Sequence, residues 1–198
     1  DYTFIFATIA LALATYLFFV YALLNNFNLM KTLRCIRNML PAAIAGFGAM
    51  SSAAAMPLTI AGAEGNAKNK NLACSVVPLT VNVHLIGDCF AIPIFAYAVM
   101  KSYGVAEPSL YTYLVFLTYF VIAKFSVAAV PGGGILVMLP VLEKQLGFNA
   151  EMLSLMTALY VLFDPVVTCA NVLGNGAFAK AIDRLSGFFS RRKTLSAD

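Results

Sequence analysis

One apolar run is interrupted by the letters "VPGGG" at residues 130–134 and then resumes. Residues 110–130 precede this interruption, and only residues 135–142 follow it before a charged pair, Glu143 and Lys144. The eight residues after the glycines reach ~12 Å as a helix, far short of a ~30 Å hydrocarbon core. We therefore predict a re-entrant helical hairpin with its tip at the glycines. The alternative is a proline-kinked pair of ordinary helices.

The composition indicates an integral membrane protein. Hydrophobic residues make up 61% of the 198-residue chain and charged residues 11%, which is too little charge to cover a water-soluble domain of this size. Residues 2–24 form an uncharged run long enough to span a bilayer, without the flanks of a signal peptide. Because the chain begins at Asp1, we expect it to be a piece of a longer protein. Its four cysteines show no paired spacing, so we expect no metal site.

The basic residues predict a second hairpin and an orientation. Residues 40–63 are apolar but interrupted at "MSSAAAMP". A single crossing there would put two basic loops in opposite compartments, which the positive-inside bias disfavours. A turn at Ser51 and Ser52 removes the conflict, and leaves only Lys101 and Lys144 on the outer face. The cytoplasmic face, with the C-terminus, then carries Lys31, Arg34, Arg37, Lys68, Lys70, Arg184, Arg191, Arg192 and Lys193.

Non-helical backbone inside a membrane is tolerated only where protein or a water-filled cavity supplies hydrogen-bond partners for its N–H and C=O groups. Two hairpins that enter from opposite faces are therefore expected to meet near the midplane and to direct free backbone groups at a bound solute.

Four motifs resemble the glutamate-transporter family, the dicarboxylate/amino acid:cation symporters. "SSAAAMPLT" is similar to the serine-rich tip of the family's first hairpin, and "PLTVNVHLIGD" to its PLGATINMDGT. "AAVPGGG" is similar to AGVPGAG, and "DPVVTCANVLGNG" to DMFRTAVNVTGD. The likeness covers nearly the whole chain and resembles the C-terminal, transport-domain half of the family. It implies an elevator mechanism and a homotrimer formed through an N-terminal scaffold half.

The resemblance also implies the organisation of the chain. We expect an all-α integral membrane transport domain with two opposed re-entrant hairpins and two broken transmembrane helices. The expected segments are a transmembrane helix (1–30), a hairpin entered from the cytoplasm (31–70), a broken helix (71–105), a hairpin entered from outside (106–147), a second broken helix (148–183) and a basic cytoplasmic tail (184–198).

Asp164 is the most informative candidate for a site residue. A carboxylate in mid-span costs ~2.5–3.5 kcal/mol to insert and is functional by default. The resemblance assigns it to a substrate amino group and assigns Asn171, on the same helix face, to the substrate carboxylate. Thr168 shares this face. The alternatives are a structural ion pair for Asp164 and interhelical hydrogen bonds for the other two.

The hairpin tips are implied to close over the substrate and to donate N–H groups to its carboxylate. The expected tip residues are Ser51, Ser52, Val130, Pro131, Gly132, Gly133 and Gly134.

Departures from the family pattern predict the substrate class. Val167 stands where acidic-substrate members carry an arginine, and Met50 stands where some members keep a substitute. Without a cation, a second substrate carboxylate would be buried unpaired. Asp88 replaces a family threonine and can accept a hydroxyl, amide or ammonium. Neutral polar or basic amino acids are favoured, and an acidic amino acid or dicarboxylate is the remote alternative.

The ion sites also depart from the pattern. Ile86 and His84 replace a sodium-binding aspartate and its partner asparagine, and Asn175 replaces a carboxylate, which argues against sodium coupling. A two-residue shift would instead place Asn82 on the family asparagine. Lys124 either stands where sodium binds, pairs with Asp88, or extends toward the membrane surface. The candidates for ion or proton coupling are His84, Asp88, Lys124, Asn171 and Asn175.

Other classes compete with a transporter. An intramembrane hydrolase would use Ser51, His84 and an aspartate, but the serine lacks the glycine surround of an exposed nucleophile. A transporter-derived binding protein or uncoupled channel is the nearer alternative. We expect no enzyme, no cofactor and no nucleic-acid partner, because membrane flanks explain the basic residues. The expected partners are an amino-acid-like solute, the bilayer and two further copies of the chain.

Overall fold

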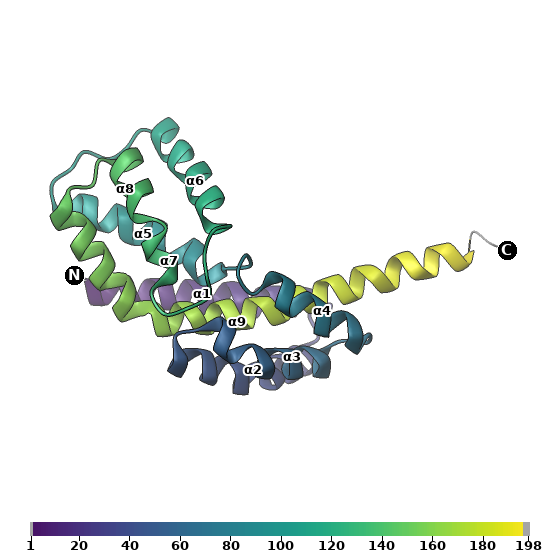
Figure 1. Ribbon diagram of the computed structural model, residues 1–198. Coiled ribbons are helices and arrows are strands. Elements are labelled where there is room, and N and C mark those ends of the chain that lie inside the picture. Colours follow the sequence, from purple (N-terminus) through teal and green to yellow (C-terminus); the bar gives the residue numbers. More distant parts are fainter. Residues whose placement is uncertain (1, 196–198) are drawn as a thin grey trace.

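The computed structural model describes residues 2–195, with side chains described through residue 188, and the described part is all helical, without a strand (Figure 1). The expected basic run at residues 191–193 lies outside the described side chains.

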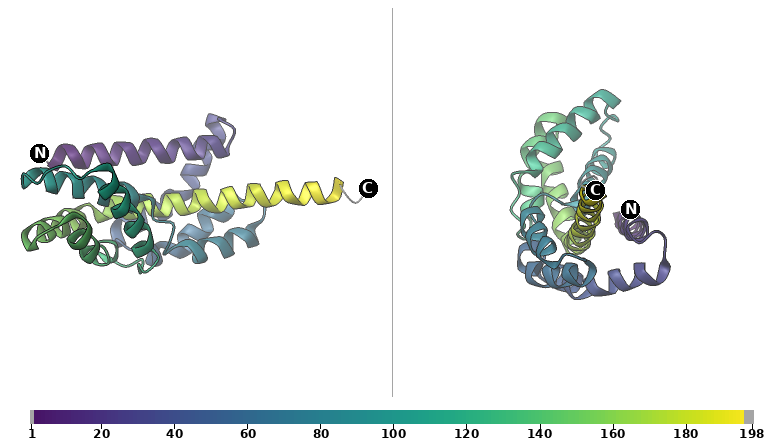
Figure 2. Two further views of the ribbon diagram at one scale, coloured as in Figure 1. Left: turned by 90° about the horizontal axis from the view of Figure 1, so that it is seen from above. Right: turned by 90° about the vertical axis from the view of Figure 1, so that its right-hand side faces the viewer.

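Two long apolar helices run side by side in the same direction (Figures 1 and 2). They are α1 (Tyr2–Leu24) and α9 (Ala150–Leu195). Each has a length and mean hydropathy suited to crossing a membrane. The buried face of α1 is a stripe of Ile9, Leu13 and Leu17 at four-residue spacing.

The first hairpin consists of α2 (Leu29–Ala49) and α3 (Ser52–Asn66). Met50 takes a left-handed backbone conformation and ends α2, and the Ser51 hydroxyl then caps α3 by accepting from the Ala54 N–H. The two arms pack closely because Gly62 lacks a side chain: a Cβ there would lie 2.7 Å from the Asn38 carbonyl. The predicted turn at the serine pair is thus a tight helix-to-helix reversal.

The next segment is a helix in two pieces, α4 (Lys70–Thr80) and α5 (Ile86–Ser102). Residues 81–85 between them are not helical. Gly87, in the first turn of α5, lies against α9, where an added Cβ would collide with the Val167 carbonyl. The break therefore lies directly on the face of α9.

The second hairpin consists of α6 (Leu110–Lys124), α7 (Gly133–Leu136) and α8 (Leu139–Leu146). Phe116 and Phe120 of α6 belong to the same buried cluster as Met138 and Leu142. Residues 125–132 form its irregular tip, and Gly132 has a φ of 69°, which favours glycine.

The expected second broken helix is wrong: α9 continues through residues 164–176 without interruption. Packing accounts for the difference. Gly174 and Gly176, which could have marked a break, instead admit neighbours, since a Cβ on Gly174 would lie 3.4 Å from the His84 ring and one on Gly176 would meet Met39. Helices α2, α3, α4 and α5 contact α9 and keep its backbone helical.

The two hairpins approach from opposite ends of α9, and their tips meet near its middle (Figures 1 and 2). The open end of the first hairpin is tied to the C-terminal part of α9, where Asp183 accepts from the Lys68 and Asn69 N–H groups. Near the open end of the second hairpin, Leu146 shares a cluster with Met152 in the first turns of α9.

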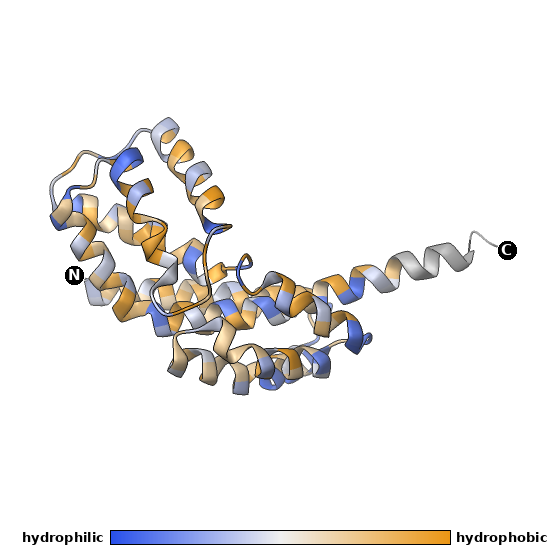
Figure 3. Ribbon diagram, viewed as in Figure 1, coloured by the Kyte–Doolittle hydropathy of each residue, from blue (hydrophilic) through white to orange (hydrophobic). Residues whose placement is uncertain are grey.

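The outer surface is rich in apolar side chains, including Phe4, Leu11, Leu79, Leu110 and Leu162, which are all at least 70% exposed. Figure 3 shows strongly hydrophilic residues at the connection between α3 and α4 and near the end of α8. A surface with charges at its ends and apolar side chains between them suits a bilayer.

Candidate functional site

The hairpin tips are joined through the backbone of one residue, Ala129. Its carbonyl accepts from the Ser51 hydroxyl at 2.8 Å and from the Ala53 N–H at 3.3 Å. Its N–H donates to the Asn82 side-chain oxygen at 3.0 Å. The first hairpin and the break before α5 therefore satisfy the irregular backbone of the second tip.

Asp164 lies beneath this junction, 4% exposed on α9. It accepts from the Gly132 N–H at 2.9 Å and from the Thr168 hydroxyl at 3.2 Å. Within the described part of the chain, no cation lies within salt-bridge distance of Asp164. The structural ion pair considered for it from the sequence does not form there.

Asp88 is the centre of a second, denser network. Its Oδ1 accepts from the Lys124 ammonium and from the Tyr160 hydroxyl, each at 2.7 Å. Its Oδ2 accepts from the Asn171 amide at 2.9 Å. Lys124 also donates to the Gly134 carbonyl at 2.9 Å. The ammonium is thus buried between α5 and the second hairpin instead of reaching the protein surface.

Asn171 uses both ends of its amide in the structure. Its nitrogen donates to Asp88, and its oxygen accepts from the Gly87 N–H at 2.7 Å. These two bonds tie α9 to the start of α5, so in this conformation the side chain holds two elements together.

A cavity of about 20 Å³ lies between the tips and α9, which is room for about one water molecule. It is lined by Met50, Ser52, Leu85, Asp88, Val127, Ala128, Ala129, Val130, Gly134, Tyr160, Asp164, Thr168 and Asn171. Most of the expected binding residues are therefore gathered around one space.

Two expected coupling residues lie elsewhere. The centroid of the His84 ring lies 4.8 Å from that of Phe178, with the two rings tilted, and the buried Nδ1 of His84 has no hydrogen-bond partner among the described residues. Asn175 donates to the Val77 carbonyl and accepts from the Thr80 hydroxyl, which ties α9 to α4. The proposed hydrolase triad does not form, because the Ser51 hydroxyl donates to the second hairpin.

Tyr160 is a site residue that was not predicted from the sequence, and Asn82 was only an alternative alignment. A signal for the tyrosine was present, since Tyr160, Asp164, Thr168 and Asn171 recur at four- and three-residue spacing and so share one helix face. The position of Asn82 depends on the non-helical break and has no comparable periodicity.

Charged side chains enclosed between two hairpin tips of an apolar, all-helical protein are typical of membrane transporters. The sequence matches the sodium:dicarboxylate symporter family over residues 1–185. The chain belongs to this family, whose members are membrane-embedded transporters and not enzymes. This confirms the family resemblance. A search of curated proteins gives no match.

Proposed function

We propose that the protein is a secondary active transporter that binds a neutral polar amino acid between two re-entrant hairpin tips. Asp164 carries the proposal. It is a buried carboxylate in an apolar helix, bonded to a backbone N–H and a hydroxyl but to no described cation. A substrate ammonium would supply the missing charge.

The substrate carboxylate would take N–H groups from the second hairpin tip and the hydroxyl of Ser52. A cavity of about 20 Å³ is too small for an amino acid. The tip must therefore move outward, and the Gly132–Asp164 and Ser51–Ala129 hydrogen bonds must break, before substrate enters. These residues would lose their contacts with one another and form contacts with the substrate instead.

The network around Asp88 supports a neutral side chain on the substrate. Lys124 is committed to Asp88 and to the Gly134 carbonyl, so no cation remains for a second substrate carboxylate. A basic side chain would meet an aspartate that is already neutralised. Asp88 Oδ2 accepts only from Asn171 in the described part, which leaves acceptor capacity for a hydroxyl or amide donor.

Lys124 would serve as a fixed cation in place of a coupling sodium ion, so transport would not require sodium. His84 lies against Phe178 and Asp88 bonds to Lys124, Tyr160 and Asn171, so these two would not carry a proton as a pair. A proton remains the candidate coupling ion, and site residues other than a His84–Asp88 pair would carry it. Elevator-type movement, a trimer and a cytoplasmic C-terminus complete the proposal by analogy with the family.

Proteoliposomes test the proposal. We expect labelled serine or glutamine to accumulate without a sodium gradient and to be displaced by neutral amino acids but not by aspartate. Aspartate as the best competitor would overturn the substrate class, and strictly sodium-dependent uptake would overturn the role of Lys124. Binding without counterflow would identify a binding protein instead.

A further inference from the structure

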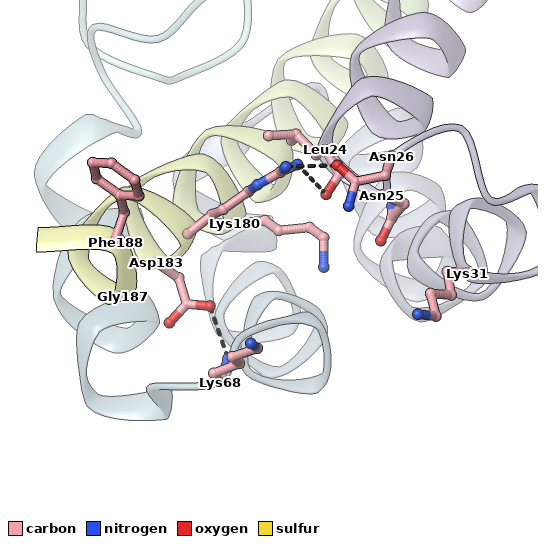
Figure 4. Close-up of a pocket in the computed structure, with 10 residues that line it drawn as sticks. Leu24, Asn25, Asn26, Lys31, Lys68, Lys180, Asp183, Gly187 and Phe188 are labelled. Carbon is pink, nitrogen blue, oxygen red and sulfur yellow. Dashed lines mark hydrogen bonds between the residues drawn. The ribbon is translucent and has the colours of Figure 1, made fainter. Parts of the chain in front are cut away.

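A second cavity lies far from the hairpin tips, at the end of the molecule where α1 ends. Its volume is about 590 Å³. Four cationic side chains line it, and Figure 4 shows three of them around one space, Lys31, Lys68 and Lys180. The fourth is Arg184. They come from α2, the connection between α3 and α4, and α9, so the fold gathers them from distant parts of the sequence.

The one described carboxylate that lines this cavity offsets only one of the four positive charges. Both oxygens of Asp183 accept backbone N–H groups, one from Lys68 at 2.9 Å (Figure 4) and one from Asn69 at 2.8 Å. Among the described residues, none of the four cations forms a salt bridge. Four cations and one carboxylate leave an excess of positive charge, and the resulting positive potential attracts an anion.

The cations divide into fixed and free groups. The Arg184 guanidinium donates to the Leu24 carbonyl at 3.0 Å and to the Asn26 side chain at 2.6 Å. Lys180 donates to the Asn66 carbonyl at 3.0 Å. The ammonium groups of Lys31 and Lys68 have no hydrogen-bond partner in the described part. Two cations are thus held in place by hydrogen bonds to the protein, and the other two are available to a ligand.

An apolar groove of about 580 Å³ adjoins the basic cavity. Leu24, Asn26 and Arg184 line both spaces. The groove adds the side chains of Leu23 and Leu185, which are 51% and 53% exposed. A ligand that fills both spaces needs an anionic head and an apolar chain attached to it.

We propose that these two spaces form a binding site for an acidic phospholipid. Its phosphate would lie among Lys31, Lys68 and Lys180, and an acyl chain would follow the groove beside Leu23 and Leu185. Basic pockets between transmembrane helices suit anionic headgroups. The site is separate from the amino-acid cavity, and the proposal does not depend on the transported substrate.

Native mass spectrometry of the purified protein, titrated with dioleoylphosphatidylglycerol, tests the head of the site. Lys31→Gln and Lys68→Gln should each weaken binding about fivefold, and the double variant about 25-fold, from about 1 kcal/mol per charge near a lipid surface. Lys144→Gln removes the same charge at the other end of the molecule and should change nothing. An equal loss in the control would overturn the proposal.

The lipid source and the groove need separate measurements. Dioleoylphosphatidylcholine should bind at least tenfold more weakly, and Leu185→Gln should weaken phosphatidylglycerol binding several-fold. Equal binding of the zwitterionic lipid, or displacement by millimolar inorganic phosphate, would overturn a phospholipid site. An unchanged melting temperature of the lysine variants without added lipid shows that a loss of binding is not a loss of folding.

Discussion

Asp88 and Asp164 are both buried carboxylates, but their partners give them different roles. Asp88 is neutralised by Lys124 and receives two further hydrogen bonds. Within the described part of the chain, Asp164 receives only the Gly132 N–H and the Thr168 hydroxyl. A buried charge without a counter-ion is costly, and binding of a substrate ammonium would remove that cost.

Replacing Asp164 by asparagine removes the charge and keeps the shape. We expect amino-acid affinity to fall at least 100-fold, because the substrate ammonium would be buried without a counter-ion. Thr168→Val is the matched control on the same helix face and should cost less than tenfold. Isothermal titration of the purified proteins measures both values, and unchanged affinity in Asp164→Asn would remove the amine assignment.

Replacing Lys124 by methionine leaves Asp88 buried and unpaired. We expect the variant to lose roughly 3–5 kcal/mol of stability, and Lys124→Met with Asp88→Asn to regain most of it. If the Lys124 ammonium occupies a site that would otherwise bind sodium, added sodium should raise the melting temperature of the single variant Lys124→Met only. Thermal unfolding in detergent, with and without sodium, checks this; equal sodium effects on all three proteins would contradict it.

At the scale of elements, glycines determine how closely the helices approach. Gly62 lets α3 lie against α2, Gly87 lets α5 begin against α9, and Gly134 lets α7 lie against the side chains of Asp88 and Tyr160. Each position lies where two segments meet, so a single methyl group there separates them. The second hairpin is thus held in place by the same network that defines the site.

Gly134→Ala should therefore displace the second hairpin tip. The added methyl group would collide with the Tyr160 hydroxyl and the Asp88 carboxylate, and overpacking of this kind costs about 1–3 kcal/mol. Gly48→Ala, which meets nothing within 4 Å, should be neutral or slightly stabilising. Melting temperatures and serine uptake compare the two, and similar behaviour would show that the tip is not closely packed.

At the scale of the whole molecule, the charged ends lie a membrane thickness apart. Tyr2, at the start of α1, donates to Ser102 at the end of α5, which places Lys101 near that end. The basic cavity lies at the other end of α1. A helix of 23 residues is about 35 Å long, so these two groups of cations suit opposite membrane faces.

Cysteine labelling tests this arrangement. In a background without the native cysteines, Lys144→Cys should react with a membrane-impermeant maleimide in intact cells, and Lys68→Cys only in inverted vesicles. The expectation follows from hairpins that enter from opposite faces and from the positive-inside bias. Labelling of both positions from one side would show that one segment crosses the membrane completely.

Local patterns in the sequence determined the helical class, the two hairpin turns and the face of α9 that carries Asp164, Thr168 and Asn171. Each of these depends on neighbours along the chain: apolar length, the break at the glycines, and helical spacing. A single sequence can therefore indicate them without coordinates.

Only the tertiary structure decided which partner each buried polar group takes. It paired Lys124 with Asp88, joined Asn82 to the second hairpin tip and placed His84 against Phe178. It also kept α9 helical where a break was expected, because the helices around it fill the space beside Gly174 and Gly176. These outcomes depend on segments that are distant in the chain, and packing, not periodicity, brings those segments together.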